Sequence, residues 1–152
     1  MRLILLCGLP GSGKTTLAKT LASTLPAIRL SPDEWMAALG VDLFDEPFRA
    51  RLEAAFRQHT RALLGQGLTV VLENGFWTRA EREEVLREGR ALGAEVQLRF
   101  LDVPFEELVR RLESRNRQPG NVLITRSMLE GFTRLFEPPD AAELARFDPS
   151  RD

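Results

Sequence analysis

The sequence predicts an α/β protein of one domain, a three-layer α/β/α sandwich around a parallel sheet of four to five strands. Short apolar segments of strand length alternate with longer amphipathic segments of helical period along the 152 residues, which is the pattern of successive β-α-β units. After Arg2, the first of these segments is apolar without interruption to Cys7, as is typical of a strand buried on both faces of a sheet. No repeat or low-complexity segment divides the chain, so a single domain should span residues 1–152.

The same patterns place the individual elements. Strands are expected at 2–7, 27–30, 68–72 and 96–100. Helices are expected at 15–25, from Ser31 onward, at 45–64, at 78–92, from Pro104 to a polar loop at 114–121, and from Thr125 to Phe136. Ser31 with Glu34, and Thr78 with Glu81, have the spacing of capping boxes. Beyond Pro138 and Pro139 the composition of 141–147 favours a short helix.

Charge and hydropathy exclude some functions. The formal net charge is −1, which gives no global electrostatic reason to coat nucleic acid or an anionic membrane. No apolar run approaches the roughly 20 residues that a membrane-spanning helix needs, and no secretory signal is apparent, so a cytoplasmic location is expected. Cys7 is the single cysteine and lies in an apolar run, where a buried thiol acts as a small hydrophobic group.

One motif carries specific chemistry, because it follows a buried strand and opens an amphipathic helix. It reads Gly-x-x-x-x-Gly-Lys-Thr and consists of Gly8, Leu9, Pro10, Gly11, Ser12, Gly13, Lys14 and Thr15. Backbone N–H groups and the helix N-terminus can converge there on a phosphate. The Lys14 ammonium can bridge the β- and γ-phosphates, and the Thr15 hydroxyl can bind Mg²⁺. We therefore expect a nucleoside triphosphate and Mg²⁺ as cofactors. Thr16 either contacts a phosphate as well or satisfies a local backbone group.

With this loop in view, the chain resembles the small P-loop kinases related to polynucleotide 5′-kinases, chloramphenicol phosphotransferases and zeta toxins. The resemblance runs from residue 1 to about 136, and its carriers are the loop at 8–15 and the segments at 30–35, 70–74 and 110–126. It implies a P-loop NTPase fold and ATP as the nucleotide. It also implies a fifth strand near the C-terminus, where the sequence itself favours a helix.

The resemblance further implies that Asp33, the acid after the second strand, orients and deprotonates the acceptor hydroxyl. The position of Asp33 agrees, since ligands bind at the carboxyl ends of the strands in an open parallel sheet. The alternative is that Asp33 only complements the dipole of the helix that it begins. Nearby aromatic side chains could wall an acceptor pocket or pack in the core; they are Trp35, Phe44, Phe76 and Trp77. Of these, Trp35 is the candidate for acceptor binding.

Glu73 and Asn74 end the third strand and are further candidates for acceptor binding. The related kinases carry an acid there, close to the acceptor or to a metal-bound water, although aspartate is commoner than glutamate. Asp102, which ends the fourth strand, is a rival for that role. The simpler expectation for Asp102 is that it caps the next helix.

An arginine-rich segment favours a phosphate-binding lid at about 113–125. The arginine-rich segment runs from 110 to 126, and Glu113 is its one acid. Its basic residues are Arg110, Arg111, Arg115, Arg117 and Arg126. A guanidinium brought in by a lid can neutralise the charge of a transferring phosphoryl group. Arg115 and Arg117 are placed best for this catalytic role. Arg110 and Arg111 can instead belong to a solvated helix face that pairs with nearby glutamates.

The leading hypothesis is therefore an ATP-dependent kinase that transfers the γ-phosphate to a hydroxyl of a small molecule. One alternative is a polynucleotide 5′-hydroxyl kinase, which needs a basic groove as well as the lid. Another, from a different class, is a nucleotide-dependent ATPase or switch module without an acceptor. No membrane partner is expected.

Overall fold

The computed structural model describes residues 1–151, and it confirms the predicted parallel α/β architecture. The sheet has four parallel strands in the order β2-β3-β1-β4. These strands are β1 (Arg2–Cys7), β2 (Ala27–Leu30), β3 (Thr69–Gly75) and β4 (Glu95–Phe100). β1 is central, and four of its residues, from Leu3 to Leu6, are almost completely buried, which explains its uninterrupted apolar sequence.

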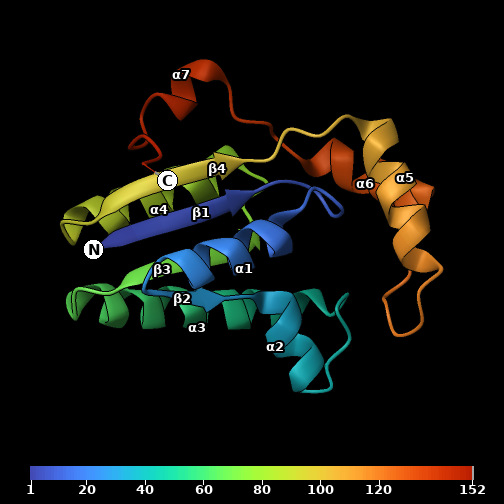
Figure 1. Cartoon of the computed structure of the whole chain (residues 1–152), viewed down its shortest axis with the longest axis horizontal. Coiled ribbons are helices and arrows are strands. Elements are labelled where there is room, and N and C mark those ends of the chain that lie inside the picture. The colour runs from blue at the N-terminus through green and yellow to red at the C-terminus, as the bar shows by residue number, and fades with distance from the viewer. Residues whose placement is uncertain (152) are drawn as a thin grey trace.

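Helices cover both faces of the sheet, so the domain has three layers (Figure 1). On one face, α1 (Lys14–Thr24) packs against Ile4, Leu6 and Val71. The other face is covered by α2 (Pro32–Ala38), α3 (Glu46–Gly65) and α4 (Arg79–Ala91). Beyond the carboxyl ends of the strands lie α5 (Phe105–Asn116) and α6 (Arg126–Leu135). No helix among residues 1–151 is long and apolar enough to cross a membrane.

The predicted caps of α4 and α6 are confirmed, and the predicted cap of α2 is confirmed in part. Thr78 and Glu81 form the full capping box of α4, and Thr125 caps α6 by accepting a hydrogen bond from the Met128 N–H. At α2, Ser31 accepts a hydrogen bond from the Glu34 N–H as expected. The Glu34 carboxylate, however, does not complete the box. It instead accepts two hydrogen bonds from the Arg29 guanidinium, because a charged partner binds a carboxylate more strongly than a backbone N–H does.

Two expectations about the helix after β4 were wrong. Asp102 does not cap it, since the N-cap residue of α5 is Pro104 and makes no side-chain capping bond. The helix also continues through the polar residues Ser114 and Arg115 as far as Asn116. Leu108, Val109 and Leu112 bury one face of α5, and this packing outweighs the low helix preference of its polar end.

The C-terminal segment forms the predicted short helix, α7 (Ala141–Leu144), where the family resemblance implied a fifth strand. It still protects the exposed edge of β4. The Asp148 N–H donates to the Val96 carbonyl at 2.8 Å, and the Val96 N–H donates to the Asp148 carboxylate at 2.7 Å. These bonds satisfy backbone groups that an open edge strand would leave unpaired. The sheet therefore ends at β4 within the described part of the chain.

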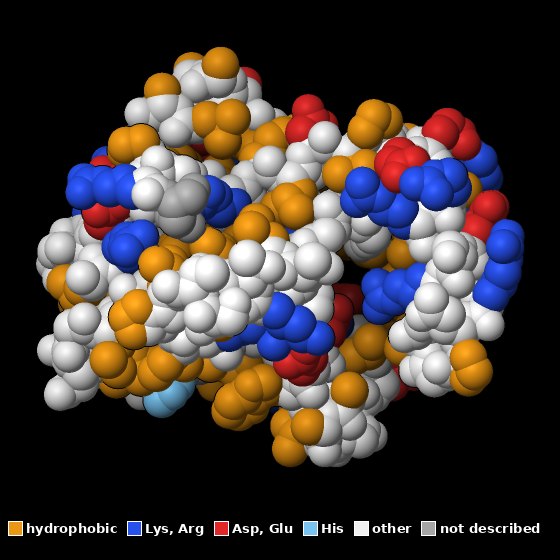
Figure 2. All heavy atoms as spheres, in the orientation of Figure 1, with side chains coloured by type: hydrophobic (Ala, Val, Ile, Leu, Met, Phe, Trp, Pro, Cys, Tyr) orange, Lys and Arg blue, Asp and Glu red, His pale blue; other side chains and the backbone are white. Residues whose placement is uncertain are grey.

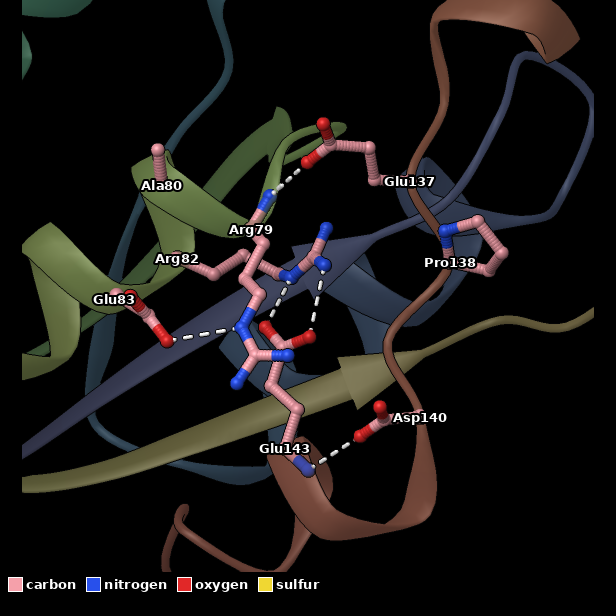
Figure 3. Close-up of a pocket in the computed structure, with 8 residues that line it drawn as sticks. All are labelled: Arg79, Ala80, Arg82, Glu83, Glu137, Pro138, Asp140 and Glu143. Carbon is pink, nitrogen blue, oxygen red and sulfur yellow. Dashed lines mark hydrogen bonds and ion pairs between the residues drawn. The ribbon is translucent and has the colours of Figure 1, made fainter.

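A buried ion pair connects α7 to α4 (Figure 3). The Arg82 side chain is completely buried, and its guanidinium donates to both carboxylate oxygens of Glu143, at 2.6 and 3.0 Å. A third bond runs from Arg82 Nη1 to the Phe76 carbonyl at 2.9 Å. Phe76 has a φ of 48°, a left-handed conformation that is costly for a residue other than glycine. Arg82 thus holds both the C-terminal helix and a strained turn after β3.

Glu143→Ala should lower the free energy of unfolding by about 3–5 kcal/mol, because it leaves the Arg82 charge buried without its partner. Urea denaturation followed by circular dichroism measures this change. The double variant Arg82→Met with Glu143→Leu, which removes both charges, should recover much of the loss. Glu106→Ala breaks an exposed ion pair between α5 and Arg126 of α6 and should leave stability almost unchanged. A Glu143→Ala variant as stable as this control would contradict the role given to the buried pair.

Candidate active site

The loop at 8–15, the P-loop, connects β1 to α1 and has the backbone that a phosphate requires. The Gly8 N–H donates to the Gly75 carbonyl at 3.0 Å, and a Cβ added at Gly8 would lie 2.6 Å from Ser12 Oγ. Gly13, the N-cap of α1, has a φ of 99°, which favours glycine. Glycine at these positions lets the loop fold tightly, so the N-terminal N–H groups of α1 remain available to an anion.

Lys14 folds back over this loop. Its ammonium donates to the carbonyls of Gly8 and Leu9, each at 2.9 Å. Burial lowers the pKa of Lys14 to about 8, against the raising effect of the Asp33 and Glu73 charges. The ammonium is therefore held by the phosphate loop, where the charges of two acids after β2 and in β3 act on it.

We expect ATP binding to weaken as the pH rises above 8. Bound phosphates favour the charged ammonium, so Lys14 stays protonated in the complex, whereas the free protein loses this proton near pH 8. Below about pH 7 the dissociation constant should be flat, and above pH 8 it should rise about tenfold per pH unit. Isothermal titration calorimetry in buffers of different ionisation enthalpy would detect the proton taken up. Lys14→Met should abolish this uptake; uptake that persists in this variant would assign the proton to another group.

Thr15 and Glu73 form an oxygen-rich site beside the P-loop. The Thr15 hydroxyl donates to the Glu73 carboxylate, whose other oxygen accepts from Arg29 Nε at 2.9 Å. Arg29 also donates to both oxygens of Glu34, so one guanidinium is shared by two carboxylates. The Glu73 side chain is only 5% exposed. Hydroxyl and carboxylate oxygens are the ligands that Mg²⁺ prefers, so the residues present fit this cation. Nothing in the sequence pattern indicated Arg29.

Asp33 stands at the start of α2 with its side chain 62% exposed. Its carboxylate is held by Arg49 of α3 at 2.8 Å, and Arg49 in turn donates to the Leu43 carbonyl at 2.8 Å. This contact fixes the direction of the Asp33 carboxylate. Sequence reasoning missed Arg49, because the spacing of α3 identifies its apolar face but not where a long polar side chain reaches.

Helix α5 packs on the P-loop. Leu9 packs against α5 in one apolar cluster with Leu108 and Leu112. Arg111 Nη1 donates to the Gly11 carbonyl at 3.3 Å. A solvated helix face was the alternative left open for Arg111, and the structure places Arg111 both on the phosphate loop and on Glu107 of its own helix.

The two arginines predicted to act from the lid are both exposed. Arg115 is close enough to Lys14 for its charge to lower the pKa of Lys14 further, after the larger effect of burial. Arg117 is the C-cap residue of α5 and begins the loop that leads to α6, so the segment predicted as a lid starts inside α5. Asn116 closes this loop by donating to the Ile124 carbonyl at 2.7 Å and accepting from the Ile124 N–H at 3.1 Å. Of the pair, the structure thus brings Arg115 into the electrostatic surroundings of the P-loop.

The remaining arginines of the segment pair with helix glutamates. Arg110 binds Glu107 of its own helix, as expected for a solvated face. Arg126 makes two hydrogen bonds to Glu106, at 2.9 and 2.8 Å, and its guanidinium lies 5.5 Å from the centre of the Phe105 ring. Arg126 therefore joins α6 to α5.

The aromatic candidates divide into two groups. Phe76 is buried in the core, and Trp77 Nε1 donates to the Gly8 carbonyl at 3.3 Å, so both are structural. Trp35 and Phe44 are 47% and 44% exposed.

Two polar candidates remain. Asn74 Oδ1 is buried and has no hydrogen-bond partner among the described residues. Thr16 lies exposed on the first turn of α1.

A hollow separates the body of the sheet from α5 and α6 (Figure 2), with basic side chains on both sides of it and acidic ones recessed between them. The P-loop, the hydroxyl and carboxylate beside it, and the arginines of α5 together define a P-loop nucleotide-binding protein. Comparison with known families agrees. A family model described as an AAA domain matches residues 3–139, so the chain belongs to the AAA domain family.

Its relatives include kinases. Shikimate kinases from two Synechococcus strains, one of them Synechococcus elongatus, are each 33% identical over 121 residues. The matches cover 76% of this chain and 60% of the relatives, so the chain spans less than two thirds of their length. A chain of the Pnkp1/Rnl/Hen1 RNA repair complex is similar in structure, with a TM-score of 0.68 and 25% identity over 88% of this chain and 43% of that chain. A gluconokinase from Sinorhizobium meliloti shares the fold, with a TM-score of 0.65 and 22% identity over 92% and 77% of the two chains.

Proposed function

We propose that the chain is an ATP-dependent and Mg²⁺-dependent kinase that phosphorylates a hydroxyl of a small molecule. One observation carries the proposal: an exposed carboxylate, Asp33, lies close enough to Lys14 for its charge to raise the pKa of that ammonium, after the larger lowering effect of burial. An exposed acid whose charge acts on the lysine of a phosphate loop is suited to orient an acceptor hydroxyl. The shikimate kinase relatives support the same class of reaction.

In the proposed reaction, the P-loop and Lys14 hold the triphosphate, and Asp33 accepts a hydrogen bond from the acceptor hydroxyl. The hydroxyl oxygen bonds to the γ-phosphorus while the bond from that phosphorus to the β-γ bridging oxygen breaks. The hydroxyl proton passes to Asp33, and the products are ADP and a phosphate monoester. Arg115 and Arg117 neutralise developing charge from the lid. Mg²⁺ held at Thr15 and Glu73 would supply further positive charge to the phosphates.

A polynucleotide 5′-hydroxyl is the second candidate acceptor, and the similarity to the RNA repair complex favours it. The charge of the chain argues for a small molecule instead. Binding a polynucleotide backbone needs several basic side chains along one groove, whereas Arg49, Arg110 and Arg126 are already paired with carboxylates. An ATPase or switch module is the remaining alternative. Such a module has no acceptor hydroxyl for the exposed Asp33 carboxylate to orient.

The test is phosphate transfer from γ-labelled ATP. The purified protein is incubated with Mg²⁺ and, in separate reactions, a panel of hydroxyl compounds, an oligonucleotide with a 5′-hydroxyl end, and no acceptor. Labelled small-molecule product supports the proposal, and labelled oligonucleotide alone supports the second candidate. Phosphate release that no acceptor changes, without any labelled product, would refute both and favour the ATPase.

A further inference from the structure

The Glu73 carboxylate beside the P-loop is held from two sides. One oxygen accepts from the hydroxyl of Thr15 in the first turn of α1, and the other accepts from Arg29 Nε at 2.9 Å. The side chains of Glu73 and Arg29 are only 5% and 15% exposed. Burying a carboxylate is costly unless its oxygens are hydrogen-bonded. These two bonds therefore fix the direction in which Glu73 faces Thr15.

Arg29 is itself held by a second acid. Its Nη1 and Nη2 donate to the two carboxylate oxygens of Glu34 on α2, at 2.9 and 2.6 Å. Two parallel bonds of this kind match the planar geometry of a guanidinium, and they leave Nε for Glu73. Glu34 directly follows Asp33 in the first turn of α2. A chain of side-chain bonds therefore runs from the turn that carries Asp33 to the hydroxyl beside the P-loop.

The other arginines of the cleft have different contacts. Arg49 binds Asp33 at 2.8 Å, Arg111 donates to a carbonyl of the P-loop, and Arg115 is exposed. Each of the three nitrogens of Arg29, in contrast, already donates to a carboxylate. Binding a phosphate would break these bonds. Arg29 is therefore suited to position an acid and not to clamp a phosphoryl group.

We propose that Arg29 is a positioning residue of the Mg²⁺ site, which holds the Glu73 carboxylate against Thr15 and is itself fixed by Glu34. The inference rests on the proposed function and adds to it a residue that sets how strongly Mg²⁺ favours nucleotide binding. Removing a group that orients a metal-binding side chain typically lowers metal affinity by about 10–100-fold. An Arg29 that only tied α2 to the sheet would have no such selective effect on the metal.

The experiment measures how much Mg²⁺ strengthens the binding of the β,γ-imido analogue of ATP. Calorimetric titration at pH 7, below the pKa of about 8 of Lys14, gives the dissociation constant with Mg²⁺ and again with EDTA. The Mg²⁺ enhancement is the constant in EDTA divided by the constant in Mg²⁺. Arg29→Lys keeps the charge but cannot bind two carboxylates through one planar group. It should lower the enhancement about tenfold and change the constant in EDTA less than about twofold.

Each variant has a matched control. Arg61→Lys also alters an arginine–glutamate pair, the one between Arg61 of α3 and Glu88 of α4, and it should leave the enhancement unchanged. Glu34→Gln loosens Arg29 from an exposed position, so it should lower the enhancement about threefold without a risk to folding. Glu84→Gln is its control, because Glu84 is 45% exposed, against 50% for Glu34, and is likewise bound to an arginine.

The outcomes separate this role from the alternatives. A larger enhancement in Arg29→Gln, with no change in Arg29→Lys, would mean that Arg29 only repels the cation, which overturns the positioning role. Equal weakening in EDTA and in Mg²⁺ would overturn it as well and make Arg29 a structural residue. An unchanged enhancement in both Arg29→Lys and Glu34→Gln, with label transfer intact, overturns this inference alone. No binding of the analogue by the unsubstituted protein would refute the proposed function itself.

Discussion

Lys14→Met should lower kcat/KM for phosphoryl transfer by about 10³-fold, the largest effect that we expect from one substitution. Methionine keeps most of the aliphatic length but cannot donate to a phosphate. In the free protein the Lys14 ammonium is held by the carbonyls of Gly8 and Leu9 at 2.9 Å, so it is already in place when the triphosphate binds. Initial rates of ADP formation with a saturating acceptor measure the loss.

Lys19 provides the control, because it is the second lysine of the chain and is exposed on the same helix. Lys19→Met should change kcat/KM less than twofold, a small effect typical of surface positions. Circular dichroism should be identical for both variants. A Lys14→Met protein with more than a tenth of the normal rate would mean that this loop does not bind the transferring phosphate.

Asp33→Asn should lower kcat by about 10²–10⁴-fold while leaving ATP affinity nearly unchanged. The amide oxygen of asparagine can still accept from Arg49 at the position now 2.8 Å away, so the local structure should persist. What is lost is the anion that orients the hydroxyl and takes its proton. Single-turnover rates, together with calorimetric titration of ATP, separate the loss of chemistry from a loss of binding.

Asp42→Asn is the matched change, because Asp42 accepts a hydrogen bond from the Phe44 N–H and asparagine can do the same. This variant should keep its full rate. Equal loss in both variants would trace the effect to the α2-α3 connection, and an unchanged rate in Asp33→Asn would assign the base to another acid or favour the ATPase.

Much of the fold could be predicted because its signals are local. The apolar run after Arg2, the capping box of Thr78 and Glu81, and the cap at Thr125 depend on residues within one or two turns. The P-loop is equally local, since its glycines act through their own backbone angles. The expected short helix at 141–147 also follows from composition, and the family resemblance was the weaker guide there.

The parts that could not be predicted depend on long side chains that cross between elements. Arg49 reaches Asp33 from another helix, and Arg29 binds Glu73 across 44 residues. The spacing of apolar residues along a helix or strand does not indicate which distant residue an arginine side chain contacts. Asp102 was expected to cap a helix because of its position alone, but the N-cap residue is Pro104. Glu34 was expected to accept from a backbone N–H, but it binds the Arg29 guanidinium.

The buried Arg82 links two parts of the chain that would otherwise behave separately. Through Arg82, α7 is bonded to the Phe76 carbonyl, which also accepts from the Cys7 thiol, and the side chain of the next residue, Trp77, donates to the Gly8 carbonyl. Local opening of α7 should therefore loosen the turn at Phe76 and Trp77 that supports the P-loop. The amide hydrogens of α7 and of the P-loop should then exchange as one cooperative unit. A ligand on the loop would then protect a helix that it never touches.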